Sequence, residues 1–152
     1  MTMINPGQTA EAQYEEAISY YKDGQYAHAL IAFEQAIGAN PRFAPAHNGK
    51  GAALYGLACY KQALVAFEQA IQLDSAYAHA WYNRGATLYC LRRYKQALEA
   101  FQRTGELDPS FAAAHTAKND VRAAMKQERF DLFFWRKNAP FLYKSLPDET
   151  LG

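Results

Sequence analysis

The sequence lacks most of the features by which membrane proteins and disulfide-rich proteins are recognised. Its 152 residues include two cysteines, Cys59 and Cys90, which are too few for a disulfide framework or a cysteine-ligated metal site. No apolar run reaches the ~18 residues that a membrane span needs, and no signal peptide opens the chain. We therefore expect a cytoplasmic protein with two free thiols, buried as small apolar groups, and we expect no membrane partner.

An excess of charge of one sign is also absent. Sixteen Lys and Arg side chains face 15 Asp and Glu side chains, so that the net charge is +1. Nucleic-acid binding depends on a basic surface, and helical repeats that read RNA carry cations in their grooves. The sequence therefore predicts no nucleic-acid partner.

What the chain does contain is an internal repeat. Three stretches superimpose at a shift of 34 residues without a single insertion. Columns with one residue type throughout include Tyr26, Tyr60 and Tyr94; Ala29, Ala63 and Ala97; and Phe33, Phe67 and Phe101. A fixed period in this range is typical of stacked repeats, which present an extended surface instead of an enclosed pocket.

Each repeat is expected to fold as two helices. Apolar residues recur mostly at intervals of three, four or seven, which indicates helix. A short polar or small stretch interrupts each unit near its middle, and Asn40-Pro41, Asp74-Ser75 or Asp108-Pro109 closes it. Asn and Asp suit helix ends, and a residue before Pro leaves the helical region. We predict an all-α fold with helices over 10–23, 26–39, 44–57, 60–73, 78–91 and 94–107.

The third unit carries the clearest family signature. Its residues are Trp81-Tyr82-Asn83-Arg84-Gly85, then Leu88, Tyr94, Ala97, Phe101 and Pro109. This pattern resembles the tetratricopeptide repeat, and all three units match over residues 10–111. The resemblance implies an α-solenoid of three helix-turn-helix repeats with a long C-terminal capping helix. Departures from the pattern are Gln13 and His47 in the column of Trp81, Ser75 in the column of Pro41 and Pro109, and Glu16 and Lys50 in place of a leucine.

These observations divide the chain into six segments. A flexible lead-in is predicted over residues 1–9, and the three repeats over 10–43, 44–77 and 78–111. Residues 112–138 are predicted to form the capping helix, because polar residues cover much of its surface and terminal repeats need such a cap for solubility. Residues 139–152 are predicted to be an aromatic and polar tail.

In the tetratricopeptide family the first helix of each pair lines the concave face, so the resemblance implies a groove there. The groove residues are Tyr14, Ile18, Tyr21, Asn48, Tyr55, His79, Tyr82, Asn83 and Tyr89. Tyrosine offers a large contact area at low entropic cost, and asparagine both donates and accepts hydrogen bonds. We expect this neutral, aromatic wall to bind an extended peptide or a partner helix. The alternative is that the tyrosines only pack between helices.

Some members of the family grip the C-terminal carboxylate of chaperone partners with a clamp of Lys, Arg and Asn. The matching positions here are Tyr14, Ile18, Gly49, His79 and Asn83. Only one asparagine remains and no fixed cation can pair with a carboxylate, so binding by that clamp is not expected.

The least family-like segment follows the repeats. Phe130, Phe133, Phe134 and Trp135 lie close together, and Pro140 ends any helix by about Asn138. Four interpretations remain open for these aromatic residues: packing on the last repeat, dimerisation or partner docking, folding back into the groove, and attachment to a membrane surface.

No catalytic constellation is recognisable. The four histidines are far apart, and the chain contains no HExxH, CxxC or phosphate-binding loop. His47, His79 and His115 could meet across adjacent helices as a metal site, but His47 and His115 also share the packing column of Trp81. We predict a non-enzymatic protein-protein interaction module (an adaptor, assembly factor or chaperone-like protein) without cofactor or metal. The alternative is a homo-oligomeric scaffold, such as a homodimer, assembled through the C-terminal aromatic helix.

Overall fold

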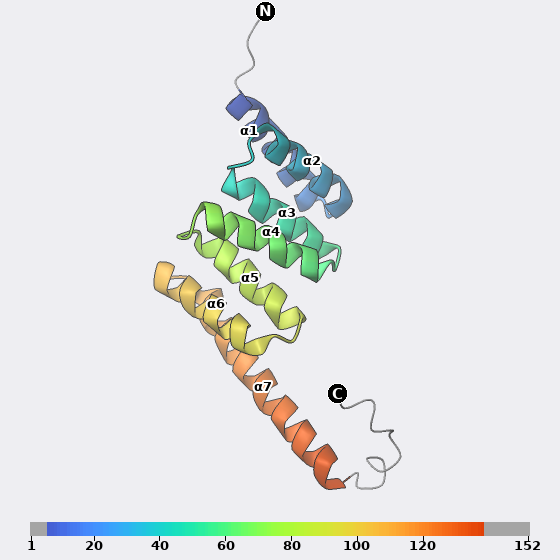
Figure 1. The fold of residues 1–152 in the computed structure, drawn as a ribbon, viewed down its shortest axis with the longest axis vertical. Helices are drawn as coiled ribbons and strands as arrows, with labels where there is room; N and C mark the ends of the chain where they lie inside the picture. The colour runs from blue at the N-terminus through green and yellow to red at the C-terminus, as the bar shows by residue number, and fades with distance from the viewer. Residues whose placement is uncertain (1–5, 139–152) are drawn as a thin grey trace, which may run out of the picture.

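The computed structural model describes the backbone of residues 6–138 and the side chains of residues 9–131. Within residues 6–138 the chain forms helices and no strand, which confirms the all-α prediction. The helices are α1 (Pro6–Lys22), α2 (Tyr26–Ala39), α3 (Ala44–Gly56), α4 (Tyr60–Leu73), α5 (Ala78–Cys90), α6 (Tyr94–Leu107) and α7 (Ala112–Asn138). Consecutive helices pack in pairs that stack along the long axis, with α1 and α7 at opposite ends (Figure 1).

The first helix begins earlier than the sequence analysis predicts. Residues 6–9, which belong to the predicted flexible lead-in, form the start of α1. Proline is favoured in a first helical turn because its ring presets φ and its missing N–H has no acceptor there. The lead-in therefore ends before Pro6, and residues 1–5 lie outside the described part of the chain.

The loops between repeats use the residues that the sequence analysis singled out. The side-chain Oδ1 atoms of Asn40, Asp74 and Asp108 each accept a hydrogen bond from the backbone N–H two residues later, at 3.1, 3.1 and 3.0 Å. Such side-chain turns end a helix by offering the backbone a partner outside it. The predicted breaks between repeats are confirmed at all three positions.

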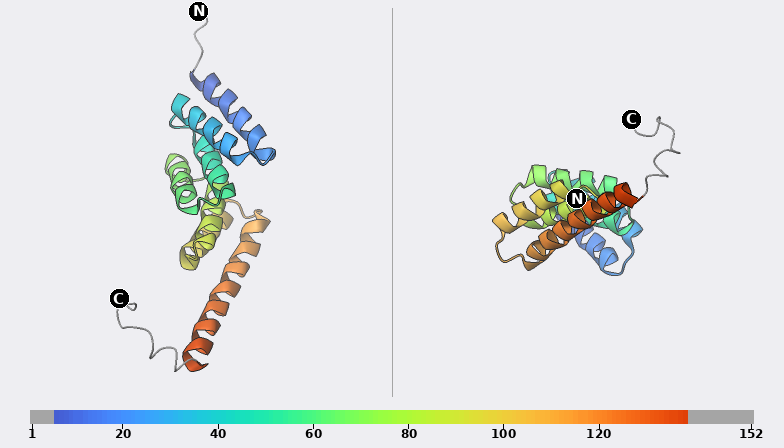
Figure 2. Two further views of the ribbon diagram at one scale, coloured as in Figure 1. Left: turned by 90° about the vertical axis from the view of Figure 1, so that its right-hand side faces the viewer. Right: turned by 90° about the horizontal axis from the view of Figure 1, so that it is seen from below.

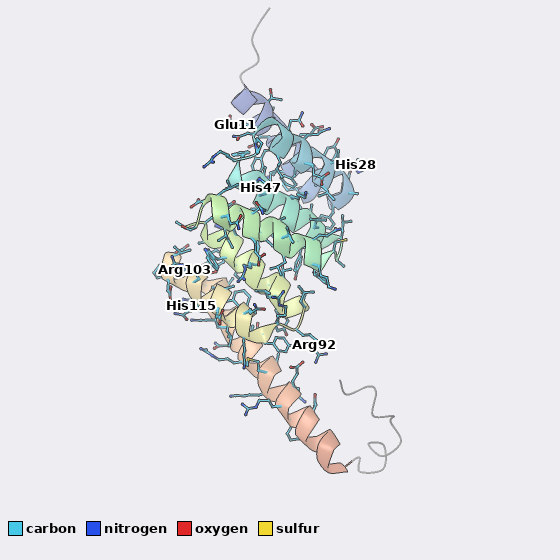
Figure 3. The ribbon with its side chains drawn as sticks, viewed as in Figure 1. Glu11, His28, His47, Arg92, Arg103 and His115 are labelled. Atoms are coloured by element: carbon cyan, nitrogen blue, oxygen red, sulfur yellow. The ribbon has the colours of Figure 1, made fainter. Side chains whose placement is uncertain are left out.

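The three rings in the column of Trp81 share one structural role. The ring nitrogens of His47, Trp81 and His115 lie 2.8, 2.9 and 3.4 Å from the backbone carbonyl oxygen six residues earlier, in the preceding loop. Both histidines lie near the start of their helices (Figure 3). Histidine with a proton on Nε2 makes the same hydrogen bond as the indole of Trp81. This contact supports the packing interpretation of His47 and His115.

The core consists of a phenylalanine on each second helix packed against a small residue on the first. Phe33, Phe67 and Phe101 are 1, 1 and 2% exposed. A Cβ atom added to Gly51 or Gly85 would come within 2.6 or 2.7 Å of the ring of Phe67 or Phe101, respectively. The small column of the sequence therefore exists to let each ring approach the helix backbone.

Polar pairs join adjacent repeats where the family resemblance leads us to expect leucine. Each pair connects the first helix of one repeat to the second helix of the repeat before it. The pairs are Lys50 Nζ with Glu34 Oε1 at 3.1 Å, Arg84 Nε with Glu68 Oε1 at 3.3 Å, and Lys118 Nζ with Gln102 Oε1 at 3.1 Å. An exposed ion pair contributes only about 0–1 kcal/mol, so these pairs align the repeats more than they stabilise them.

The turn inside each repeat places one residue in the left-handed region. Gly24, Ala58 and Arg92 have φ angles of 73°, 58° and 59°. In the second repeat the N–H groups of Ala58 and Cys59 donate to the carbonyl oxygens of Tyr55 and Leu54, both at 2.9 Å, as in a Schellman cap. Cys59 is exposed on this turn and Cys90 is half-buried, so the expectation that both cysteines are buried is wrong.

The last helix both caps the stack and extends beyond it. Asn119 and Arg122 occupy the columns of Gly85 and Leu88, and both are exposed where those residues are buried. A polar surface on this side of α7 does not favour the packing of another helix there. The 27 residues of α7 are about twice the 13 of α3 or α5, so α7 projects past the body (Figure 2).

Candidate functional site

The first helices α1, α3, α5 and α7 contact one another in order, and their shared face carries two adjoining clefts. We call the two clefts together the groove. The smaller cleft has a volume of about 230 Å³ and is lined by Tyr21, Ala52, Tyr55, Phe67, Tyr82, Asn83 and Ala86. Its floor is the buried ring of Phe67, and its walls are aromatic rings separated by alanines. No charged side chain is among these lining residues.

The larger cleft lies between α5 and α7. Its volume is about 570 Å³, and its lining residues are Tyr55, Tyr82, Ala86, Tyr89, Phe101, Ala117, Asp120, Val121, Ala123, Ala124 and Gln127. Tyr55, Tyr82 and Ala86 belong to both clefts, which makes them one continuous hollow. Asp120 is the only charged side chain in either set of lining residues.

Five of the predicted groove residues meet in these clefts: Tyr21, Tyr55, Tyr82, Asn83 and Tyr89. The tyrosine ladder consists of Tyr21, Tyr55 and Tyr89, which are one repeat period apart. Each of these rings packs on the tyrosine that begins the following helix. The ring centroids of these pairs are 5.3, 5.3 and 5.5 Å apart. This packing holds the rings of the ladder in position, and Tyr55 and Tyr89 remain 36 and 39% exposed.

The other four predicted residues have different surroundings. Tyr14 and Ile18 pack against the core of the first repeat, and the Tyr14 ring lies 5.3 Å from that of Phe43. His79 is exposed and its ring lies 5.1 Å from that of Phe111. Asn48 is half-buried within a hydrogen-bonded network.

A network of carboxamides borders the smaller cleft. Asn83 Nδ2 donates to Asn48 Oδ1 at 3.0 Å, and Asn48 Nδ2 donates to the hydroxyl of Tyr77 at 3.3 Å. Because a carboxamide carries two N–H groups, Asn83 keeps a second donor beyond this bond. Its orientation is fixed by residues of two other segments, so Asn83 offers a positioned hydrogen-bonding group at the edge of the cleft.

Several tyrosine hydroxyls in and near the groove resist ionisation. The contact of the Tyr55 hydroxyl with Cys90 Sγ, at 3.3 Å, together with burial, holds the pKa of Tyr55 well above its usual range. Burial is also the main cause that raises the pKa of Tyr14, Tyr21 and Tyr77. These hydroxyls therefore stay protonated at neutral pH and can act as hydrogen-bond donors.

The α7 wall of the groove is the part that the sequence analysis missed. Ala117, Asp120 and Ala123 fall one repeat period after Asn83, Ala86 and Tyr89. The same 34-residue shift that identified the other columns identifies them too. The polar surface of α7 indicated only a cap, so the groove was not predicted to continue onto this helix.

The predicted assembly surface is only partly described. Phe130 lies on α7 and is 61% exposed. Phe133, Phe134 and Trp135 lie on the same helix, but their side chains are outside residues 9–131, as is the whole of the predicted tail over 139–152. The clustering of these rings therefore stays a prediction.

Two other features are absent from the part of the chain that the structure describes. No group of three or more His, Cys, Asp or Glu side chains there could hold a metal ion, so His47, His79 and His115 do not converge. None of the described helices is long and apolar enough to cross a membrane.

Comparison with known proteins identifies the repeat. The family model described as Tetratricopeptide repeat matches residues 10–43 and 78–111, and one described as TPR repeat matches residues 59–91. No curated protein is similar enough to the chain to count as a relative.

Solved structures show the same fold. The Arabidopsis OM64 TPR domain is 27% identical, with 79% of this chain and 99% of that one covered and a TM-score of 0.77. The first TPR domain of Spaghetti (RPAP3), bound to the HSP90 peptide SRMEEVD, is 22% identical over 83% of this chain and 99% of that one, with a TM-score of 0.77. The second TPR domain of human RPAP3, in complex with the HSP70 peptide SGPTIEEVD, is 24% identical over 78% and 98%, with a TM-score of 0.75. With three helix pairs, a capping helix and these matches, the chain belongs to the tetratricopeptide-repeat family.

Proposed function

We propose that this protein is a non-enzymatic interaction module that binds a segment of a partner protein in the groove. The observation that carries the proposal is the continuity of the two clefts, which together follow the stack from Tyr21 on α1 to Gln127 on α7. A hollow of this kind can hold a chain of several residues. Rigid tyrosine rings separated by alanines favour an extended segment or a helix whose apolar side chains enter between the rings.

The groove chemistry favours a segment without acidic groups. Tyrosine hydroxyls and the Asn83 carboxamide can bond to the peptide backbone, and the only charged lining residue is Asp120. The RPAP3 domains were solved with peptides that end in Glu-Glu-Val-Asp. No lysine or arginine is among the lining residues of this groove, so a peptide carboxylate would lose its water without gaining a cation.

The first prediction concerns the tyrosine ladder. Peptides selected by phage display on the full chain are expected to lose about tenfold in affinity on Tyr55→Ala or Tyr89→Ala, because buried tyrosine anchors commonly contribute 1–2 kcal/mol or more. Fluorescence anisotropy with the labelled peptides measures the change. The HSP90 peptide SRMEEVD should bind no more tightly than a scrambled version.

The matched controls lie on the outer helices. Ile31→Ala and Val65→Ala remove apolar side chains that are 56 and 58% exposed on α2 and α4, away from the groove. They should leave peptide affinity unchanged. Loss of affinity in these variants, with full affinity in Tyr55→Ala and Tyr89→Ala, would place the binding site on the outer face and contradict the proposal.

One observation favours a second candidate function, a homo-oligomeric scaffold. The helix α7 continues past the stack and bears Phe130, Phe133, Phe134 and Trp135 on its final turns. Aromatic residues of this kind are enriched in interfaces between subunits. Self-association through them would leave the groove open for a different partner.

The second prediction tests this candidate by light scattering coupled to size exclusion. If α7 is the interface, the full chain runs as a dimer, whereas a chain that ends at Gln127 and the full-length variant Phe134→Glu both run as monomers. Circular dichroism should be unchanged in Phe134→Glu and should fall in the shorter chain only by the share of residues 128–138 of α7. A full-length chain that is already monomeric, or a dimer that survives both changes, would rule out assembly through α7.

A further inference from the structure

We infer that a second site binds the carboxylates of an acidic polypeptide segment, in a cationic cleft on a different face of α7 from the groove. The cleft has a volume of about 500 Å³. Its lining comes from the turn after α5, the first turn of α6, and α7: Arg92, Tyr94, Lys95, Met125, Glu128 and Arg129. Arg92 lies beside α7 at this turn (Figure 3). None of these residues lines the groove.

The cleft exists because α7 is longer than the other first helices. The 13 residues of α5 correspond to residues 112–124 of α7. Met125, Glu128 and Arg129 all lie beyond that length. Met125 also packs against the core cluster of the last repeat, but Glu128 and Arg129 are not part of that cluster, so the charged side of the cleft is not required for stacking.

The lining residues carry three cations and one carboxylate. Arg92 contacts Glu128 Oε1 through Nε, at 2.9 Å, and through Nη2. This ion pair shows that the cleft already holds one carboxylate of the chain itself. Lys95 and Arg129 are exposed, and neither forms an ion pair with another residue of the described range 9–131. Two positive charges therefore remain without a counter-charge there.

The other turns of the solenoid lack this arrangement. Gly24 and Ala58 occupy the left-handed position of Arg92 in the first and second repeats. Ala58 shows that a small residue suffices for the turn, and a left-handed conformation costs a non-glycine residue about 1 kcal/mol. An arginine therefore gives this turn no conformational advantage. Its guanidinium instead contacts Glu128 on α7.

The chemistry of the lining suits acidic side chains on a peptide. A guanidinium binds a carboxylate through two parallel hydrogen bonds, and a lysine adds a less directional charge. Tyr94 and Met125 supply ring and thioether surface for the methylene groups of a glutamate. A hollow with three cations can take more than one carboxylate, so adjacent acidic residues fit it better than a single one.

The test uses a fluorescein-labelled octaglutamate peptide and the full-length chain, with octaglutamine as the uncharged probe. Fluorescence anisotropy at low salt should show octaglutamate binding that weakens with added NaCl, and no octaglutamine binding. Lys95→Gln and Arg129→Gln should each weaken binding about two- to fivefold, the range for one exposed charge pair. Arg92→Gly, which also relieves the turn, should do the same. Glu128→Gln should strengthen binding, because the internal carboxylate no longer competes for Arg92.

Matched control variants distinguish binding in this cleft from attraction to the overall charge of the protein. Lys61→Gln removes the charge at the equivalent position of the second repeat, Glu11→Gln removes an exposed carboxylate on α1, and Tyr21→Ala alters the groove at its α1 end. All three should leave octaglutamate affinity unchanged. Equal losses in Lys61→Gln and Lys95→Gln, or equal gains in Glu11→Gln and Glu128→Gln, would overturn the proposal. Inorganic phosphate that displaces the peptide at equal concentration would overturn the assignment to a polypeptide.

Discussion

Replacing Phe67 by alanine is expected to lower the free energy of unfolding by about 3–5 kcal/mol, the cost of removing a fully buried aromatic ring. Phe67 is 1% exposed and forms one cluster with Leu54, Ala63 and Ala66. The backbone at Gly51 lies against its ring, so on that side there is no side chain to move into the cavity. A domain of this size has about 5–15 kcal/mol in total, so the loss is a large share of it.

The matched control is Val65→Ala on the same helix. Val65 is 58% exposed, so its truncation removes little buried surface and should change stability by less than about 0.5 kcal/mol. Urea denaturation followed by circular dichroism measures both variants. Because the second repeat connects the first and the third, Phe67→Ala should also broaden the transition as the outer repeats uncouple. Equal stability of the two variants would contradict the position of Phe67 in the core.

Most of the fold could be predicted because the repeat period fixes the helix ends. The helices predicted over 26–39, 60–73 and 94–107 coincide with α2, α4 and α6. Asn40, Asp74 and Asp108 end these helices through local hydrogen bonds that depend on the nearest residues alone. Local chemistry of this kind is readable from the sequence.

The start of α1 was less predictable. The 34-residue period does not locate the start of α1, because the first repeat begins at residue 10. The pattern of apolar residues also shows no clear helical turn before Ala10. Pro6 was the available signal, because proline favours the beginning of a helix.

The candidate site was only partly predictable. The period placed Tyr21, Tyr55 and Tyr89 on one surface, and they all line the groove. The contact of Tyr55 with Cys90 could not be predicted, because the two residues are 35 positions apart and so belong to different columns of the 34-residue repeat. Contacts between columns depend on how adjacent repeats rotate against each other, which the period alone does not give.

Gly49 shows the same limit and leads to the second large effect. Gly49 matches one of the positions of a peptide clamp in the family, but in the structure it is buried against Phe33 of the preceding repeat. A Cβ atom on Gly49 would lie closer to the Phe33 ring than real contacts allow. Its column holds Glu15 and Asn83 in the other repeats, so the period gave no indication of a small residue.

Gly49→Ala is therefore expected to destabilise the protein by about 1–3 kcal/mol, the usual cost of overpacking a core. Alanine is the better helix former by about 1 kcal/mol, so propensity alone predicts the opposite sign. Gly38→Ala on α2 separates the two effects, because a Cβ atom there meets nothing within 4 Å. That variant should gain about 0.5–1 kcal/mol from propensity. Urea denaturation of both variants measures whether the free energy of unfolding falls in Gly49→Ala and rises in Gly38→Ala.

The location of the damage distinguishes Gly49 from the other core glycines. Phe33 belongs to α2 and Gly49 to α3, so the added methyl group separates the first repeat from the second. Gly51→Ala instead strains the second repeat internally, against Phe67. Hydrogen exchange should then show early loss of protection in α1 and α2 for Gly49→Ala, and in α3 and α4 for Gly51→Ala. If both variants lost protection uniformly along the chain, the repeats would unfold as one unit, and the boundary between the first and second repeats would not be a separable interface.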